Sequence, residues 1–141
     1  GHDYNVPMEC SESFENMSDS ELASYSAIIV PSGIVSDRLR YTEDVKKLPP
    51  ACEFMKRAFE NKKILKGIIC HGMWIMSPIS DIIKGRRVVV HNNLIGDAKN
   101  YGLEYVDEDV VVDGDLVTAR TGGHCHLFAA EIIKRLSDSG K

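Results

Sequence analysis

The chain has no long apolar segment and no excess of positive charge, and each shortage excludes a class of protein. None of its apolar runs approaches the roughly 20 residues that cross a bilayer, so we expect no membrane partner. It has 17 lysines and arginines against 21 aspartates and glutamates, which gives a formal charge of −4. A nucleic-acid partner would need a basic face, so none is expected. The opening residues Gly1 to Tyr4 are polar, and no secretory signal is expected there.

Cysteine is also scarce, which excludes a small disulfide scaffold. The four cysteines are Cys10, Cys52, Cys70 and Cys125. Their spacing matches no such scaffold, and a chain of 141 residues can bury a core without disulfides. We therefore expect reduced thiols and a cytoplasmic location. Cys52 falls on the apolar face of a predicted helix, where a cysteine is usually a core residue.

The sequence does contain an alternation of short apolar runs and helical patterns. Four runs predict strands of a covered sheet, at residues 27–30, 64–69, 88–90 and 110–112. The first and third are apolar throughout, as expected of strands buried on both faces. Helices are predicted at residues 21–25, 51–61, 73–77, 94–101 and 127–136. The alternation predicts an α/β fold, a doubly wound and mostly parallel sheet, in a single domain over residues 1–141.

One segment departs from this alternation. Residues 110–118 read Val-Val-Val-Asp-Gly-Asp-Leu-Val-Thr, and Asp113-Gly114 is typical of a type I′ turn. The sequence therefore predicts a small antiparallel hairpin attached to the parallel sheet.

The segment that points to chemistry is Gly67 to Trp74, in which an apolar run leads through Cys-His-Gly into a helix. A turn of this kind lifts a nucleophile above the sheet edge. It also places the Cys70 thiol at a helix N-terminus, where the helix dipole favours thiolate. Gly72 lets the backbone turn without a Cβ in the way. A buried, inert cysteine is the simpler alternative, but its position at the end of a strand favours a functional thiol.

A second loop supports this hypothesis. Val30-Pro31-Ser32-Gly33 also ends a predicted strand. The backbone N–H groups of Gly33 and His71 would then form an oxyanion site with one donor from each loop. An ordinary Pro-Gly turn explains the same residues, and the sequence does not separate the two.

The order and spacing of several segments along the chain resemble the ThiJ/PfpI family of cysteine-nucleophile proteins. The segments are Val30 to Gly33, Cys70 to Gly72, Lys84 to Arg86, Tyr105 to Glu108, Val111 to Gly114 and Leu116 to Arg120. The resemblance implies a flavodoxin-like sandwich, no cofactor, and a homo-oligomer, either a dimer or a hexamer. Family members are described as intracellular peptidases, as glyoxalases that make lactate from methylglyoxal, as deglycases, and as stress or redox proteins.

The resemblance also implies roles for individual residues. Cys70 falls on the family's nucleophile and His71 on the histidine beside it, while Gly33 and His71 fall on the oxyanion donors. Asp37 falls where PfpI-like members have a glutamate that reaches the histidine of an adjacent subunit, although aspartate is one methylene shorter. His91 falls where the branch of the parkinsonism-associated deglycase has a histidine close to the cysteine.

Three departures from the family pattern stand out. The stretch Gly122 to His126 is richer in imidazole and thiol than the loop that the family usually has there. The usual Pro-Gly-Gly is Pro31-Ser32-Gly33 in this chain. The resemblance also implies a strand-helix-strand piece of roughly 30 residues before the segment resembling Gly1 to Tyr4. That piece carries a glutamate that hydrogen-bonds the cysteine. We therefore expect that the domain is N-terminally incomplete and that the 141 residues alone do not form a stable monomer.

The sequence thus predicts a cysteine-dependent enzyme acting on a small carbonyl compound or a peptide, either as a glyoxalase or deglycase or as a peptidase-like hydrolase. Cys70 would attack the carbonyl carbon, and His71 or His91 would move protons. A redox or stress sensor that uses an oxidisable Cys70 without catalysis is the alternative.

A metal site is a third hypothesis, with thiol and imidazole ligands that suit zinc. Its candidate ligands are Cys70, His71, His124, Cys125 and His126. Because alternating residues at a helix start need not point together, helix capping is favoured and no metal site is predicted. Asp107 to Asp109 are expected to form a solvated turn, and Arg120 is expected to hold a loop in place.

Overall fold

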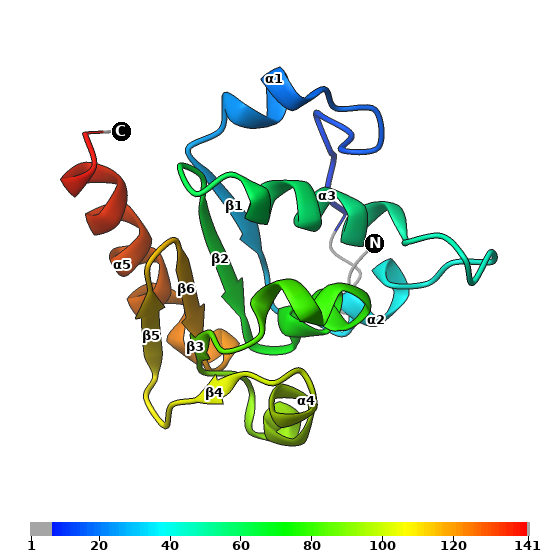
Figure 1. The fold of residues 1–141 in the computed structure, drawn as a ribbon. Coiled ribbons are helices and arrows are strands. Elements are labelled where there is room, and N and C mark those ends of the chain that lie inside the picture. Colours follow the sequence, from blue (N-terminus) through cyan, green and yellow to red (C-terminus); the bar gives the residue numbers. More distant parts are fainter. Residues whose placement is uncertain (1–6, 141) are drawn as a thin grey trace.

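The computed structural model, which describes residues 7–140, has the predicted α/β fold (Figure 1). Four strands form one sheet in the order β1-β2-β6-β5. β1 (Ala27–Val30), β2 (Leu65–Ile69) and β6 (Leu116–Ala119) are parallel, and β5 (Val110–Asp113) pairs antiparallel with β6. A separate parallel pair is formed by β3 (Arg87–Val88) and β4 (Glu104–Tyr105). The mostly parallel sheet with one antiparallel pair is therefore confirmed.

Helices cover both faces of the four-stranded sheet, as Figure 1 shows for α5 on one side and α3 on the other. The α-helices are α1 (Asp19–Ala23), α2 (Val35–Leu39), α3 (Pro50–Glu60), α4 (Ile95–Asn100) and α5 (Cys125–Asp138). The 3₁₀ helices are η1 (Cys70–Ile83), η2 (Asn92–Leu94) and η3 (Gly122–His124). Within residues 7–140, no helix is both long and apolar enough to cross a membrane.

Two helices begin or end away from their predicted bounds. α1 begins two residues before the predicted Glu21, because Ser18 and Glu21 form a reciprocal capping box at its start. The helix predicted over residues 73–77 is instead the 3₁₀ helix η1, which begins at Cys70 and continues to Ile83. It is interrupted at Ile79, which has non-helical backbone angles and follows Pro78.

The strand predictions need two corrections. β1 is not buried on both faces: it lies at an edge of the four-stranded sheet, and Ile29 is 44% exposed. Val88, Val89 and Val90 are fully buried, as predicted, yet this run is not a strand of the main sheet. The Val89 N–H donates to the Thr118 side-chain hydroxyl (3.0 Å) rather than to a strand backbone. Apolar composition predicted burial here but could not predict the pairing partner.

The hairpin is present, with its turn one residue later than predicted. Asp113 pairs with Leu116, so Gly114 and Asp115 are the two turn residues. Gly114 has φ 58°, whereas Asp115 has no positive φ. A single positive φ at the first turn position is the pattern of a type II′ turn, which requires glycine there, and not of type I′.

Beneath this turn lies a partly buried ionic network around Lys66. Lys66 of β2 is completely buried, and its ammonium group donates to the Asn61 carbonyl (2.9 Å) and to the Asp115 carboxylate. Asp115 also accepts a hydrogen bond from Arg86 (2.7 Å), which binds Asp113 as well (2.8 Å). The network joins β2, the hairpin turn and the start of β3.

The core of the protein has two parts, one on each face of the sheet. On one face, α5 packs on β2 and β6 through Phe128 and Ile132. On the other face, α3 and η1 pack together and cover the opposite side of the same strands. The carboxyl end of β2, where η1 begins, is therefore packed against core residues on both faces of the sheet.

Candidate active site

Cys70 occupies the sharp turn that was predicted between strand and helix. It directly follows β2, whose five residues are all buried, and it is the first residue of η1. Its φ of 60° is the one positive φ among the non-glycine residues 7–140. Left-handed backbone at a non-glycine residue is strained, and such strain concentrates at functional sites. The Cys70 residue is 7% exposed, so the surrounding structure holds the thiol in place.

His71 lies directly against this thiol. The distance from Cys70 Sγ to His71 Nδ1 is 3.2 Å. The His71 ring meets the Trp74 ring edge-on (centroids 4.9 Å apart) and lies 4.6 Å from the His91 ring. Partial burial lowers the pKa of His71, and the charge of His91 lowers it further, while Asp97 opposes both. His71 is therefore neutral near pH 7, and its Nδ1 can accept the thiol proton when that nitrogen carries none.

His91 comes to the site from the segment after the buried Val88 to Val90 run, at the start of η2. The backbone N–H of Asn93 donates to His91 Nδ1 (3.1 Å). Because Nδ1 accepts this hydrogen bond, the proton of the neutral imidazole is on Nε2. His91 can therefore donate a hydrogen bond from Nε2, whereas His71 can accept one at Nδ1.

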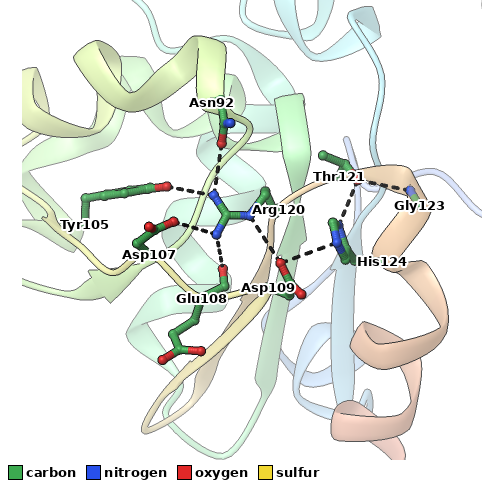
Figure 2. Close-up of polar contacts among 9 residues, drawn as sticks. All are labelled: Asn92, Tyr105, Asp107, Glu108, Asp109, Arg120, Thr121, Gly123 and His124. Atoms are coloured by element: carbon green, nitrogen blue, oxygen red, sulfur yellow. Dashed lines mark hydrogen bonds and ion pairs between the residues drawn. The ribbon is translucent and has the colours of Figure 1, made fainter.

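The segment that carries His91 is fixed by Arg120, which follows β6 (Figure 2). The guanidinium donates to Asn92 Oδ1 (3.0 Å), Tyr105 Oη (2.9 Å), Asp107 Oδ1 (2.8 Å), the Glu108 carbonyl (3.1 Å) and Asp109 Oδ1 (3.3 Å). Arg120 thus holds the loop after β4 in place, and it also binds Asn92, the residue next to His91. Its predicted role in holding a loop is confirmed, and its link to the site was not predicted.

The metal ligand set considered from the sequence does not assemble. His124 Nδ1 hydrogen-bonds Thr121 Oγ1 (2.8 Å) and its Nε2 lies 3.4 Å from Asp109 (Figure 2). Cys125 and His126 are exposed. In residues 7–140, the cluster of three or more potential ligands consists of Cys70, His71 and His91, whose ligand atoms lie within 4.8 Å of one another. Cys70 and His71 therefore belong to the cluster, and its third member is His91 rather than His124, Cys125 or His126.

Asp37 lies outside this cluster. Its carboxylate accepts two hydrogen bonds from Arg40, at 3.0 and 2.6 Å, and its side chain is 58% exposed. The Arg40 guanidinium lies 5.2 Å from the Trp74 ring centroid, and Trp74 in turn contacts His71. Contact between Asp37 and a histidine of an adjacent subunit stays a prediction.

The Pro31-Ser32-Gly33 loop lies beside the Cys70 turn because Gly72 lets the two backbones come close. A Cβ on Gly72 would lie 2.9 Å from the Pro31 carbonyl oxygen and 3.1 Å from that of Val30. The role of Gly72 is thus this close approach of two loops. The oxyanion role of the Gly33 and His71 N–H groups stays a prediction.

Gly72→Ala is expected to destabilise the protein by about 1–3 kcal/mol, because the added methyl group would have to displace backbone. The labelling rate of Cys70 should change as well, since the loop beside it moves. Gly96→Ala is the matched control: a Cβ there meets nothing within 4 Å, and its position in α4 favours alanine. Urea denaturation of both variants measures the effect, and equal stability of the two would contradict the close-approach role of Gly72.

Cys52 is the buried, unreactive thiol that the sequence predicted. Its Sγ donates to the Ile75 carbonyl (3.2 Å), and burial raises the pKa of its thiol to about 11. In iodoacetamide labelling from pH 5 to 9, we expect the exposed Cys10 and Cys125 to react and Cys52 to stay unmodified in the folded protein. Peptide mass spectrometry measures each site. Labelling of Cys52 as fast as Cys125 would show that this part of the core opens.

A family model for the DJ-1/PfpI family matches residues 2–135. The chain belongs to the DJ-1/PfpI family. A deglycase of Pyrococcus abyssi is 30% identical over 135 residues, which cover 96% of this chain and 74% of the relative. Deglycase PfpI of Pyrococcus furiosus is 29% identical with the same coverage. YraA of Bacillus subtilis, provisionally named a cysteine protease, is 32% identical over 120 residues, which cover 85% of this chain and 66% of the relative.

Solved structures agree with the DJ-1/PfpI fold. DJ-1 of Schizosaccharomyces pombe superposes with a TM-score of 0.73 at 22% identity, covering 94% of this chain and 67% of that protein. A two-domain protein of Anabaena variabilis, with DJ-1/ThiJ/PfpI-like and ferritin-like domains, has a TM-score of 0.76 at 27% identity, covering 88% of this chain and 32% of that protein. The resemblance to the ThiJ/PfpI family is therefore confirmed.

Proposed function

We propose that this chain carries the reactive centre of a cysteine-dependent enzyme that acts on small carbonyl compounds, as a deglycase or glyoxalase does. The observation that carries the proposal is the Cys70–His71 contact: a thiol held on strained backbone, with an imidazole nitrogen 3.2 Å from its sulfur. The names of the archaeal relatives as deglycases support this substrate class.

In the proposed reaction, the neutral His71 accepts the Cys70 thiol proton at Nδ1. The thiolate sulfur then adds to the carbonyl carbon of an aldehyde or ketone. A carbon–sulfur bond forms, and the electron pair of the carbonyl bond moves onto oxygen. His71 returns the proton it accepted to that oxygen, to which His91 donates a hydrogen bond from Nε2, and the product of these steps is a hemithioacetal. The N–H groups of Gly33 and His71 are proposed to hold the developing oxyanion.

The direct test is turnover of methylglyoxal by the purified chain and by its Cys70→Ser variant. We expect the unmodified chain to consume methylglyoxal and release lactate, and Cys70→Ser to lose both activities. Cys125→Ser is the matched control, because it removes an exposed thiol that lies outside the Cys70 cluster. Equal turnover by the unmodified chain and Cys70→Ser would overturn the proposal.

The same preparations distinguish the alternatives. Cleavage of a fluorogenic peptide without methylglyoxal turnover would indicate a peptidase-like hydrolase instead. If neither substrate reacts but dilute peroxide adds two oxygen atoms to Cys70 before it modifies Cys125, the thiol acts as a redox sensor, because sulfinic acid is the stable product of that oxidation.

A further inference from the structure

The three side chains around the thiol also have the composition of a metal site. Cys70 Sγ, a nitrogen of His71 and a nitrogen of His91 all lie within 4.8 Å of one another. Zinc bonds of about 2.3 Å to sulfur and 2.0 Å to nitrogen, at a tetrahedral angle, separate the two ligand atoms by about 3.5 Å. The 3.2 Å distance from Cys70 Sγ to His71 Nδ1 is close to that value.

We propose that Cys70, His71 and His91 bind a Zn²⁺ ion with three protein ligands and an open fourth position. A site of one thiolate and two imidazoles favours zinc over magnesium and calcium, because the latter two ions bind oxygen ligands. His71 and His91 are both partly exposed, so an ion can enter from solvent. On binding, the sulfur–zinc bond replaces the sulfur–hydrogen bond, and the thiol proton leaves to solvent.

Two of the ligands are already held in position. The left-handed backbone at Cys70 orients its thiol, and the T-shaped contact with Trp74 orients the His71 ring. His91 must change its hydrogen bonding, because its Nδ1 accepts from the Asn93 N–H. If zinc binds Nδ1, it replaces that donor; if zinc binds Nε2, the ring proton moves to Nδ1. In both cases the Asn93 N–H loses its acceptor.

This geometry makes zinc and the carbonyl substrate compete for the same sulfur, because a thiolate bound to zinc is not free to attack carbon. We therefore expect Zn²⁺ to inhibit the enzyme reversibly, with activity restored by a chelator. The inhibition rests on the proposed function, whereas metal binding itself does not.

The test uses the reduced, chelator-treated chain. Calorimetry with Zn²⁺ should give one site per chain, and Co²⁺ should add thiolate-to-metal absorption in the near ultraviolet. Cys70→Ser should remove that absorption, and His91→Asn should weaken Zn²⁺ binding by more than the roughly 10–100-fold that loss of a supporting residue costs. Cys125→Ser, which lies beside His124 and His126, should bind as the unmodified chain does. Circular dichroism checks that each variant is folded.

A backbone readout tests the role of His91 separately. Saturating Zn²⁺ should shift the Asn93 amide resonance in a ¹⁵N–¹H spectrum, because its acceptor is lost, and the Gly96 amide nearby serves as reference. Absence of binding, binding unchanged in Cys70→Ser, or binding abolished in Cys125→Ser would each overturn the proposed site. Zinc binding without turnover by the metal-free chain would refute only the proposed function. Turnover without zinc binding would refute only this site.

Discussion

Asp115→Ala is expected to lower the free energy of unfolding by about 3–5 kcal/mol, because it removes the carboxylate partner of a buried lysine. Lys66 is completely buried, and Asp115 is the carboxylate that its ammonium group contacts. Without that carboxylate, folding would bury the Lys66 charge without the ion pair to Asp115, while its hydrogen bond to the neutral Asn61 carbonyl stays. The loss should appear in urea denaturation as a lower midpoint.

Asp107→Ala is the matched control for this prediction. Asp107 also pairs with an arginine, but its side chain is 83% exposed, so its removal should cost less than about 1 kcal/mol. Adding Lys66→Met to Asp115→Ala should recover most of the loss, because the buried charge is removed as well. A double variant no more stable than Asp115→Ala alone would contradict the ion-pair explanation.

The same network should make the free energy of unfolding depend on pH in the acidic range. Burial is the largest single influence on the pKa of Asp115 and would raise it, but the hydrogen bonds and charges of Lys66 and Arg86 together outweigh burial and hold that pKa below its ordinary value. A carboxylate with a lowered native pKa stabilises the folded state above its unfolded pKa of about 3.9. That contribution is lost as the pH falls from there through the native pKa. Asp115→Ala should therefore reduce the pH dependence of stability in this acidic range.

The strand and helix pattern could be predicted largely from the sequence, because burial follows directly from apolar runs. What the pattern could not predict was which backbone each run contacts. The run 88–90 is as buried as its composition predicts, but a Thr118 hydroxyl takes the Val89 N–H, so the run lies outside the main sheet. The predicted turn of the hairpin was one residue too early, because Asp-Gly and Gly-Asp both suit tight turns and the sequence here contains both.

The site residues also differ in how far the sequence could predict them. Cys70 and His71 could be predicted from their place after a strand, because position along one chain segment suffices for adjacent residues. His91 is 20 residues further on, and its approach to the thiol depends on how the loops after β3 and β6 are tied by Arg120. Local residues alone did not predict this approach, and the family resemblance did. In the described residues, the group His124 to His126 is not part of the cluster with Cys70, in line with the argument that neighbouring residues at a helix start need not point together.

His71→Asn is expected to lower kcat/KM for methylglyoxal by about 10²–10⁴-fold near pH 7, because it removes the group that accepts the thiol proton. In the unmodified chain, His71 must be neutral to act. Its pKa is lowered by partial burial and by His91, so activity should fall only below the ordinary histidine pKa of about 6.5. This acid limb should be absent from His71→Asn. His126→Asn, at an exposed histidine outside the cluster, should retain both the rate and the limb.

His91→Asn separates the two imidazoles by the direction of its effect on pH. Removing the charge of His91 removes a cause that lowers the pKa of His71, so that pKa should rise toward its ordinary value. His71 would then be protonated at a higher pH, and the acid limb of kcat/KM should move upward. An acid limb that stays in place in His91→Asn but vanishes in His71→Asn would show that the rings, 4.6 Å apart, titrate independently. A limb that vanishes in His91→Asn and persists in His71→Asn would exchange their roles and make His91 the base that activates Cys70.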